Sequence, residues 1–228
     1  MTCLFDPPAI PSLPILGSDL RFPVRRIFCI GRNYADHAAE MGSVPDLEQP
    51  MFFCKPADAV VTDGADVPYP SATASLHHEV EMVVALGAGG RDIAPADAQA
   101  RVYGYGVGLD LTRRDLQAQA KAKRHPWDVA KGFDHSAPVS ALRPATLGVP
   151  DDDTVLRLQV NDQPRQSATL GQMLHGVPRI IAVLSTLFEL KAGDLIFTGT
   201  PAGVAELARG DRFHAELAGV AELRGRIV

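Results

Sequence analysis

Three acidic side chains are placed so that they could converge on one metal ion. Glu79 and Glu81 lie two residues apart in HHEVEMVVAL (77–86), whose apolar and β-branched composition predicts a central strand. Alternate residues of a strand project from the same face, so the two carboxylates share a face about 7 Å apart along it. Asp110 ends the glycine-rich apolar run 102–111 just before an expected helix, where a carboxylate can point into a pocket.

Carboxylate oxygens without a nearby cysteine are hard ligands, which suit Mg²⁺ or Mn²⁺ better than zinc. Such an ion keeps coordination positions open for water or substrate. The alternative is that Glu79 and Glu81 are two charges at a solvent-facing strand end, and their pattern alone leaves this open. His77 and His78 adjoin the pair, and we interpret both as structural because satisfied structural histidines are commoner than functional ones.

A candidate general base lies near the N-terminus. His37 and Glu40 are three residues apart in the short helix predicted for YADHAAEM (34–41), so the carboxylate can orient the imidazole. The alternative for this segment is an exposed helix with mixed charges. Lys131 could neutralise developing negative charge, and Thr200 in the loop GTPAGV could bind a substrate carboxylate, although neither residue is decisive alone.

The elements that must position these residues follow from periodicity and turn residues. A short strand is expected at 27–30, and Thr112 with Asp115 predicts a capping box for a helix that runs to Lys123. Further expected elements are a strand at 156–160 with a hairpin turn at Asn161 and Asp162, a core helix from Pro178 with the apolar stripe Ile180, Ile181, Val183, Leu184, Leu187 and Phe188, and strands at 195–198, 212–217 and 221–228.

Composition limits the class of protein. With 228 residues, 46% hydrophobic and 21% charged, the chain is expected to form one globular domain (24–228) after a proline-rich N-terminal arm (1–23). A formal charge of −5 argues against a nucleic-acid partner. The cysteines form no CxxC pair, and no leader or membrane-length apolar run is seen, so we expect a cytoplasmic protein with no membrane partner.

Six ordered segments together resemble the fumarylacetoacetate hydrolase family, in particular its short acylpyruvase and fumarylpyruvate hydrolase branch. They are GRNYADHAAEMG (31–42), FFCKPADAVV (52–61), LHHEVEMVVALG (76–87), GLDLTRRDLQ (108–117), PWDVAKGFD (126–134) and LIFTGTPAGV (195–204). The resemblance covers roughly residues 24–228. It implies an α+β, strand-rich mixed β-roll of the type found in the C-terminal domain of that family, forming a homodimer.

The resemblance also implies roles for individual residues. Glu79, Glu81 and Asp110 correspond to metal ligands, His37 and Glu40 to a water-activating pair on a lid, and Lys131 to the active-site lysine. Arg114, Gln117 and Thr200 correspond to substrate-contacting residues.

The implied reaction is metal-dependent hydrolysis of a carbon–carbon bond in a small 2,4-dioxo acid, with fumarylpyruvate giving fumarate and pyruvate. The distal carboxylate of that substrate needs a cation, for which Arg32, Arg113 and Arg124 are candidates. Two enzymatic alternatives, oxaloacetate decarboxylase and 2-hydroxy-dienedioate isomerase, share enolate chemistry at a metal. A non-catalytic β-roll binding module is the alternative from another class.

Overall fold

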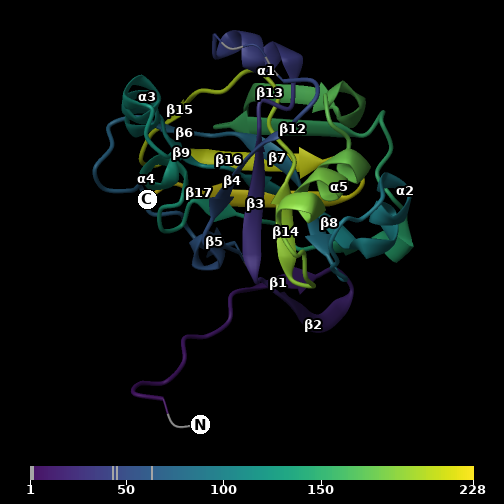
Figure 1. The fold of residues 1–228 in the computed structure, drawn as a ribbon. Helices are drawn as coiled ribbons and strands as arrows, with labels where there is room; N and C mark the ends of the chain where they lie inside the picture. The colour runs from purple at the N-terminus through teal and green to yellow at the C-terminus, as the bar shows by residue number, and fades with distance from the viewer. Residues whose placement is uncertain (1–2, 43, 45, 63) are drawn as a thin grey trace.

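A six-stranded sheet with an apolar cluster on each face forms the centre of the protein (Figure 1). The computed structural model describes residues 3–42, 44, 46–62 and 64–228. The spatial order of the sheet is β11-β8-β7-β14-β3-β4, in which β14 is parallel to β3 and the other neighbours are antiparallel. The strand-rich α+β architecture expected from the sequence is confirmed.

The strands of this sheet are β3 (Arg26–Gly31), β4 (Met51–Lys55), β7 (Val80–Leu86), β8 (Val102–Leu109), β11 (Arg143–Pro144) and β14 (Asp194–Phe197). Every residue of β7 is buried, and its side chains alternate between the two clusters. Met82 and Val84 face one cluster, while Val83 and Ala85 face the other. This two-sided burial explains why the segment is almost continuously apolar apart from Glu81.

The larger apolar cluster lies between this sheet, a four-stranded antiparallel sheet and a long helix. The second sheet has the order β13-β12-β16-β17, with β12 (Val155–Val160), β13 (Gln163–Thr169), β16 (Arg212–Leu217) and β17 (Ala221–Arg226). Leu156 and Leu158 of β12 contribute to the cluster with Ile180 and Leu184 of α5 (Val177–Leu187). The expected hairpin is present, and both Asn161 and Asp162 adopt the positive φ that a two-residue turn requires.

The smaller cluster covers the other face of the central sheet. Its partners include the N-terminal hairpin of β1 (Ser12–Ile15) and β2 (Ser18–Pro23), through Leu13, Ile15 and Phe22. Residues 3–11 extend away from this hairpin (Figure 1). Part of the proline-rich segment therefore packs against the sheet, while its beginning projects from it.

The remaining elements connect these layers. The short strands are β5 (Val60–Val61), β6 (Leu76–His77), β9 (Thr112–Arg113), β10 (Ala137–Pro138) and β15 (Glu206–Leu207). The helices are α1 (Ala35–Glu40), α2 (Pro95–Ala98), α3 (Arg114–Lys123) and α4 (Asp128–Lys131), with 3₁₀ turns at Ala57–Ala59, Gln99–Arg101, Ala145–Leu147 and Leu170–Gln172.

Two local predictions were wrong. The capping box of Thr112 and Asp115 does not form, because Thr112 lies in β9 and Asp115 instead accepts hydrogen bonds from the Thr73 hydroxyl and the Ala74 backbone. Leu187 is 59% exposed and lies outside the core, although Leu184 is buried and Phe188 packs against the larger cluster.

Among the residues described, no helix combines the length and the apolar character that crossing a membrane would require.

Candidate metal centre and active site

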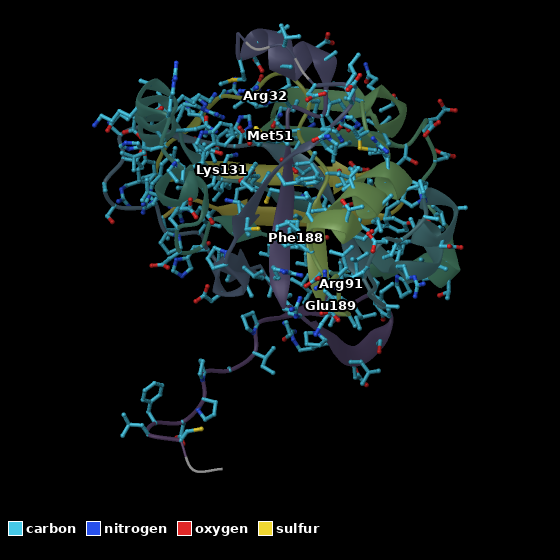
Figure 2. All side chains as sticks on the ribbon, viewed as in Figure 1. Arg32, Met51, Arg91, Lys131, Phe188 and Glu189 are labelled. Carbon is cyan, nitrogen blue, oxygen red and sulfur yellow. The ribbon has the colours of Figure 1, made fainter. Side chains whose placement is uncertain are left out.

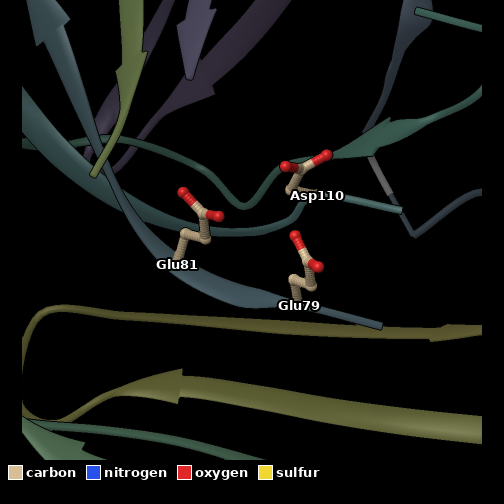
Figure 3. A group of neighbouring side chains, drawn as sticks. All are labelled: Glu79, Glu81 and Asp110. Carbon is tan, nitrogen blue, oxygen red and sulfur yellow. The ribbon is translucent and has the colours of Figure 1, made fainter. Parts of the chain in front are cut away.

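Glu79, Glu81 and Asp110 meet at one point inside the protein (Figure 3). One carboxylate oxygen from each lies within 4.8 Å of the others, and all three residues are buried. Antiparallel pairing of β7 with β8 sets Glu81 opposite Gly108, and the Asp110 N–H donates to the Glu79 carbonyl at 2.8 Å. The register of two neighbouring strands therefore brings together acids that are far apart in the sequence.

Buried carboxylates need compensating charge, and three cations surround this group. Lys131 Nζ donates at 2.6 Å to both Glu79 Oε2 and Asp110 Oδ2, and Arg114 Nη2 donates at 2.5 Å to Glu79 Oε1. Lys55 Nζ lies 2.8 Å from Asp110 Oδ1. Glu81 forms no ion pair among the described residues and accepts only the Gly199 N–H, at 2.6 Å.

The three acids consequently differ in proton affinity. Burial, followed by the charges of Asp110 and Glu79, raises the pKa of Glu81 well above its usual value. Burial would also raise the pKa of Glu79, but the charges of Lys131 and Arg114 outweigh it and hold that pKa well below the usual range. Glu81 is thus the carboxylate whose negative charge the protein itself leaves least compensated.

This arrangement fits a hard divalent cation. The donors are all carboxylate oxygens, and among the described residues Asp110 Oδ1 accepts no hydrogen bond although Lys55 Nζ lies 2.8 Å away, so this oxygen can still bind an ion. A cation between the three acids would also compensate Glu81. The residues present therefore can hold Mg²⁺ or Mn²⁺.

The loop after β14 supports the centre through backbone groups. Gly199 adopts φ +97°, and a Cβ there would lie 2.6 Å from the Cβ of Asn33, so glycine is required where the N–H contacts Glu81. Asn33 in turn donates to the carbonyls of Thr198 and His175. The segment after β3 and the loop after β14 are therefore held together beside the carboxylates.

Thr200, expected to contact substrate, is buried in this loop and accepts a hydrogen bond from Gln166 Nε2 at 2.8 Å. Because Gln166 uses a lone pair of the hydroxyl, the Thr200 hydrogen remains available to donate to an anionic ligand. The same amide accepts from the Val80 N–H and lies 2.9 Å from His78 Nδ1. His78 therefore has a structural position, as the sequence indicated.

His37 and Glu40 form the expected pair on α1, with 3.4 Å between Nδ1 and Oε2. His37 is buried, whereas Glu40 is partly exposed and accepts the Gly203 N–H at 3.2 Å, which ties α1 to the loop that carries Thr200. Burial lowers the pKa of His37, against the charges of Glu79 and Glu40, which raise it. The imidazole is therefore neutral near pH 7 and able to accept a proton.

The face of α3 nearest the carboxylates carries the other expected substrate contacts. Arg114 Nη1 donates to Gln117 Oε1 at 2.6 Å while Nη2 holds Glu79, so the two side chains form one hydrogen-bonded unit at the metal centre. Hydrogen bonds join Glu79, Asp110, Lys131, Arg114 and Gln117 into one group. Glu81 accepts from Gly199, next to Thr200, and the His37 that pairs with Glu40 lies close enough to Glu79 for that charge to raise its pKa.

Comparisons with known proteins agree with this geometry. The family model described as the fumarylacetoacetate hydrolase C-terminal domain matches residues 26–228. The chain belongs to the fumarylacetoacetate hydrolase family. The fumarylpyruvate hydrolase of Pseudomonas aeruginosa, solved with Mn²⁺ and pyruvate, is 47% identical with a TM-score of 0.96, over 100% of this chain and 99% of that one. A fumarylpyruvate hydrolase proposed for Burkholderia cenocepacia is 52% identical with a TM-score of 0.92, over 100% and 98%.

Other relatives in the family carry a different activity. An oxaloacetate tautomerase of Escherichia coli is 42% identical over 86% of this chain and 89% of its own length. The mitochondrial oxaloacetate tautomerase of mouse is 42% identical over 89% and 91%. Family members are therefore enzymes of more than one type.

Two residues that contribute to this family site were not assigned roles from the sequence. Gln166 orients Thr200, and Lys55, 1% exposed, donates to the Leu111 and Lys131 carbonyls beside Asp110. The position of Lys55 in FFCKP, at the end of an apolar strand, was visible. A lysine expected to be buried needs an acidic partner, and that requirement could have connected it with Asp110.

A cavity of about 450 Å³ opens beside Lys131. It is lined by Phe53, Trp127 and Lys131, together with Met51, Phe52, Cys54, His125, Pro126 and Asp128. Two of these lining residues, Met51 and Lys131, are labelled in Figure 2. The cavity gives a small ligand space next to the carboxylates.

Glu81→Gln and Glu79→Gln are expected to differ because only Glu79 is ion-paired. Both variants should weaken Mn²⁺ binding more than about 100-fold in isothermal titration, since each loses a charged ligand. In chelator, Glu81→Gln should leave the urea midpoint unchanged or raise it, whereas Glu79→Gln should lower it because Lys131 and Arg114 lose their partner. Equal destabilisation by both changes would contradict the charge assignment.

Lys55→Met should destabilise the metal-free protein by about 3–5 kcal/mol, since it leaves Asp110 with less compensating charge in the interior. Urea denaturation measures this, and adding Mn²⁺ should recover part of the loss because the ion compensates the same carboxylate. Lys123→Met, on the exposed side of α3, is the control and should stay within about 0.5 kcal/mol of the parent. A loss that Mn²⁺ leaves unchanged would argue that Lys55 serves packing alone.

Proposed function

We propose that this protein is a metal-dependent hydrolase that cleaves the C3–C4 bond of a 2,4-dioxo acid, with fumarylpyruvate as the preferred substrate. The observation that carries the proposal is the match along the whole chain to a fumarylpyruvate hydrolase solved with Mn²⁺ and pyruvate. Pyruvate is one half of the proposed substrate, and the carboxylate triad here supplies the ligands for such an ion.

A divalent cation held by Glu79, Glu81 and Asp110 supplies Lewis-acid polarisation of the 1-carboxylate and 2-oxo group. The side chains of the protein do the rest. Thr200 and Arg114 orient the pyruvoyl end, because one has a free hydroxyl hydrogen and the other a guanidinium at the metal centre. Lys131, whose pKa is raised by Asp110 and Glu79 against the opposing effect of burial, stays charged and stabilises developing negative charge.

Proton transfer falls to His37. The neutral imidazole, oriented by Glu40, takes a proton from a water as the water oxygen bonds to C4. The C3–C4 bond then breaks, its electron pair goes to C3, and the proton held by His37 is returned there. One water is consumed. The products are pyruvate and the carboxylic acid whose carboxyl carbon was C4, which is fumarate when the substrate is fumarylpyruvate.

Oxaloacetate tautomerisation is the second candidate, because relatives 42% identical are tautomerases. That reaction moves a proton between C3 and the 2-oxo oxygen without breaking a carbon–carbon bond, and the same metal and imidazole could serve it. The homodimer and the cytoplasmic location inferred from the sequence stay predictions, which sedimentation and cell fractionation measure.

With Mg²⁺ or Mn²⁺ and fumarylpyruvate, the purified protein should release fumarate and pyruvate in equal amounts, and chelation should abolish this until metal is restored. His37→Ala should keep its Mn²⁺ affinity and lose about 10²–10⁴-fold in kcat, since it removes the base and no ligand. Tautomerisation or decarboxylation of oxaloacetate without cleavage of any acylpyruvate would overturn the hydrolase proposal. An unchanged rate in His37→Ala would favour a different base.

The pH profile gives a separate test of His37. Because burial lowers its pKa, the acid limb of kcat/KM should have its midpoint below the ordinary histidine value of about 6.5, and activity should fall as the pH drops through it. Glu40→Gln removes a charge and a hydrogen bond that raise this pKa, so the limb should move to lower pH. A midpoint above 6.5, or a profile that Glu40→Gln does not move, would contradict the assignment.

A further inference from the structure

One face of α3 carries three polar residues toward the metal centre. Arg114, Gln117 and Lys121 are spaced at i, i+3 and i+7, which places them in one row along the helix. Arg114 is ion-paired with Glu79, and Gln117 is 3% exposed and bonded to Arg114. Lys121 is the next member of the row, one turn farther from the carboxylates.

Lys121 packs against one of the residues that line the cavity beside Lys131. Its Nζ lies 5.3 Å from the centre of the Trp127 ring, and Trp127 lines the cavity together with Phe53 and Lys131. The Phe53 and Trp127 rings are 5.9 Å apart and form an apolar wall. Lys121 does not itself line the cavity, but its ammonium group packs on the ring of Trp127, which does.

Within the described part of the chain, the ammonium group of Lys121 forms no ion pair. Lys131 and Arg114 both form ion pairs with carboxylates of the metal centre, whereas no described carboxylate forms an ion pair with Lys121. Burial, followed by the charges of Arg114 and Arg32, lowers its pKa. A partly buried cation among other cations is a site where an anion would be stabilised.

Arg32 adds to this positive region from the segment after β3. It follows Gly31, against which the Met51 side chain packs, and Met51 lines the same cavity (Figure 2). Arg32 also adopts φ 60°, a left-handed conformation that is unfavourable for a residue with a side chain and that concentrates at functional sites.

We propose that Lys121, assisted by Arg32, binds the distal carboxylate of the substrate and so makes the enzyme selective for dicarboxylic over monocarboxylic 2,4-dioxo acids. This rests on the proposed hydrolase function. With the pyruvoyl end at Glu79, Glu81 and Asp110, which would hold the cation, the acyl chain would lie against Phe53 and Trp127 and the second carboxylate would reach Lys121.

The other candidate cations are less suited. The Arg113 guanidinium packs 4.4 Å from the centre of the Phe133 ring and donates to the Val129 carbonyl. Arg124 is exposed at the left-handed end of α3. Among the described residues, neither guanidinium stacks on a ring that lines the cavity, whereas Lys121 stacks on Trp127.

The first test compares fumarylpyruvate with crotonylpyruvate, in which a methyl group replaces the distal carboxylate. Lys121→Gln should lower kcat/KM for fumarylpyruvate roughly 10- to 100-fold, mostly through KM, and change it less than about threefold for crotonylpyruvate. Lys123→Gln, two residues along on the exposed side of the helix, is the matched control and should leave both values unchanged. Equal losses on both substrates, or no loss on either, would overturn the proposal.

The second test is independent of turnover. Trp127 is the single tryptophan of the chain, so its fluorescence reports on the cavity at Lys121. Titration of the Mn²⁺-loaded protein with fumarate should change this emission at lower concentrations than titration with crotonate, and Lys121→Gln should remove the difference. If the parent protein cleaves neither dioxo acid, the proposed function fails, whereas equal responses to fumarate and crotonate would refute the carboxylate site itself.

Discussion

Compensation of buried negative charge is the constraint on which the rest of the structure depends. Three carboxylates lie together in the interior, where unpaired charges are strongly unfavourable. Lys55, Lys131 and Arg114 reach the group from three different elements, so β4, α4 and α3 must dock at the ends of β7 and β8. The same contacts that hold the outer elements in place therefore prepare the site for a cation.

Apolar packing on both faces of the central sheet holds β7 and β8 in place, and these strands position the buried carboxylates. β7 divides its side chains between two apolar clusters, so a shift of one residue in its pairing would exchange both sets at once and move Glu81 to the wrong face. Glycine at position 199 then allows the loop after β14 to approach close enough for its N–H to contact Glu81. The strand register and the backbone conformation at Gly199 therefore determine where the carboxylates lie.

Sequence patterns predicted the features that depend on local periodicity. The alternating spacing of Glu79 and Glu81, the position of Asp110 after an apolar run and the hairpin at Asn161 were all visible, because each follows from neighbours in the chain. The partners of Lys55 and Asp115 were not, because they lie 55 and 42 residues away and depend on tertiary docking. The capping box is absent for the same reason. The Asp115 carboxylate accepts hydrogen bonds from Thr73 and Ala74 and does not bond to the backbone of Thr112.

The positions of the charges separate the groups proposed for the chemical step from those proposed for substrate selection. Under the proposed function, the residues around the carboxylates would bind a 2-oxo acid by its 1-carboxylate and 2-oxo group, and the relatives of this chain include both hydrolases and tautomerases. Under the proposed function, substrates would be distinguished beyond Lys131, where Phe53 and Trp127 form an aromatic wall and Lys121 has no ion pair among the described residues. A charge left uncompensated within the protein is stabilised only when the ligand supplies its partner, so selectivity arises from the same physical requirement that assembles the metal centre.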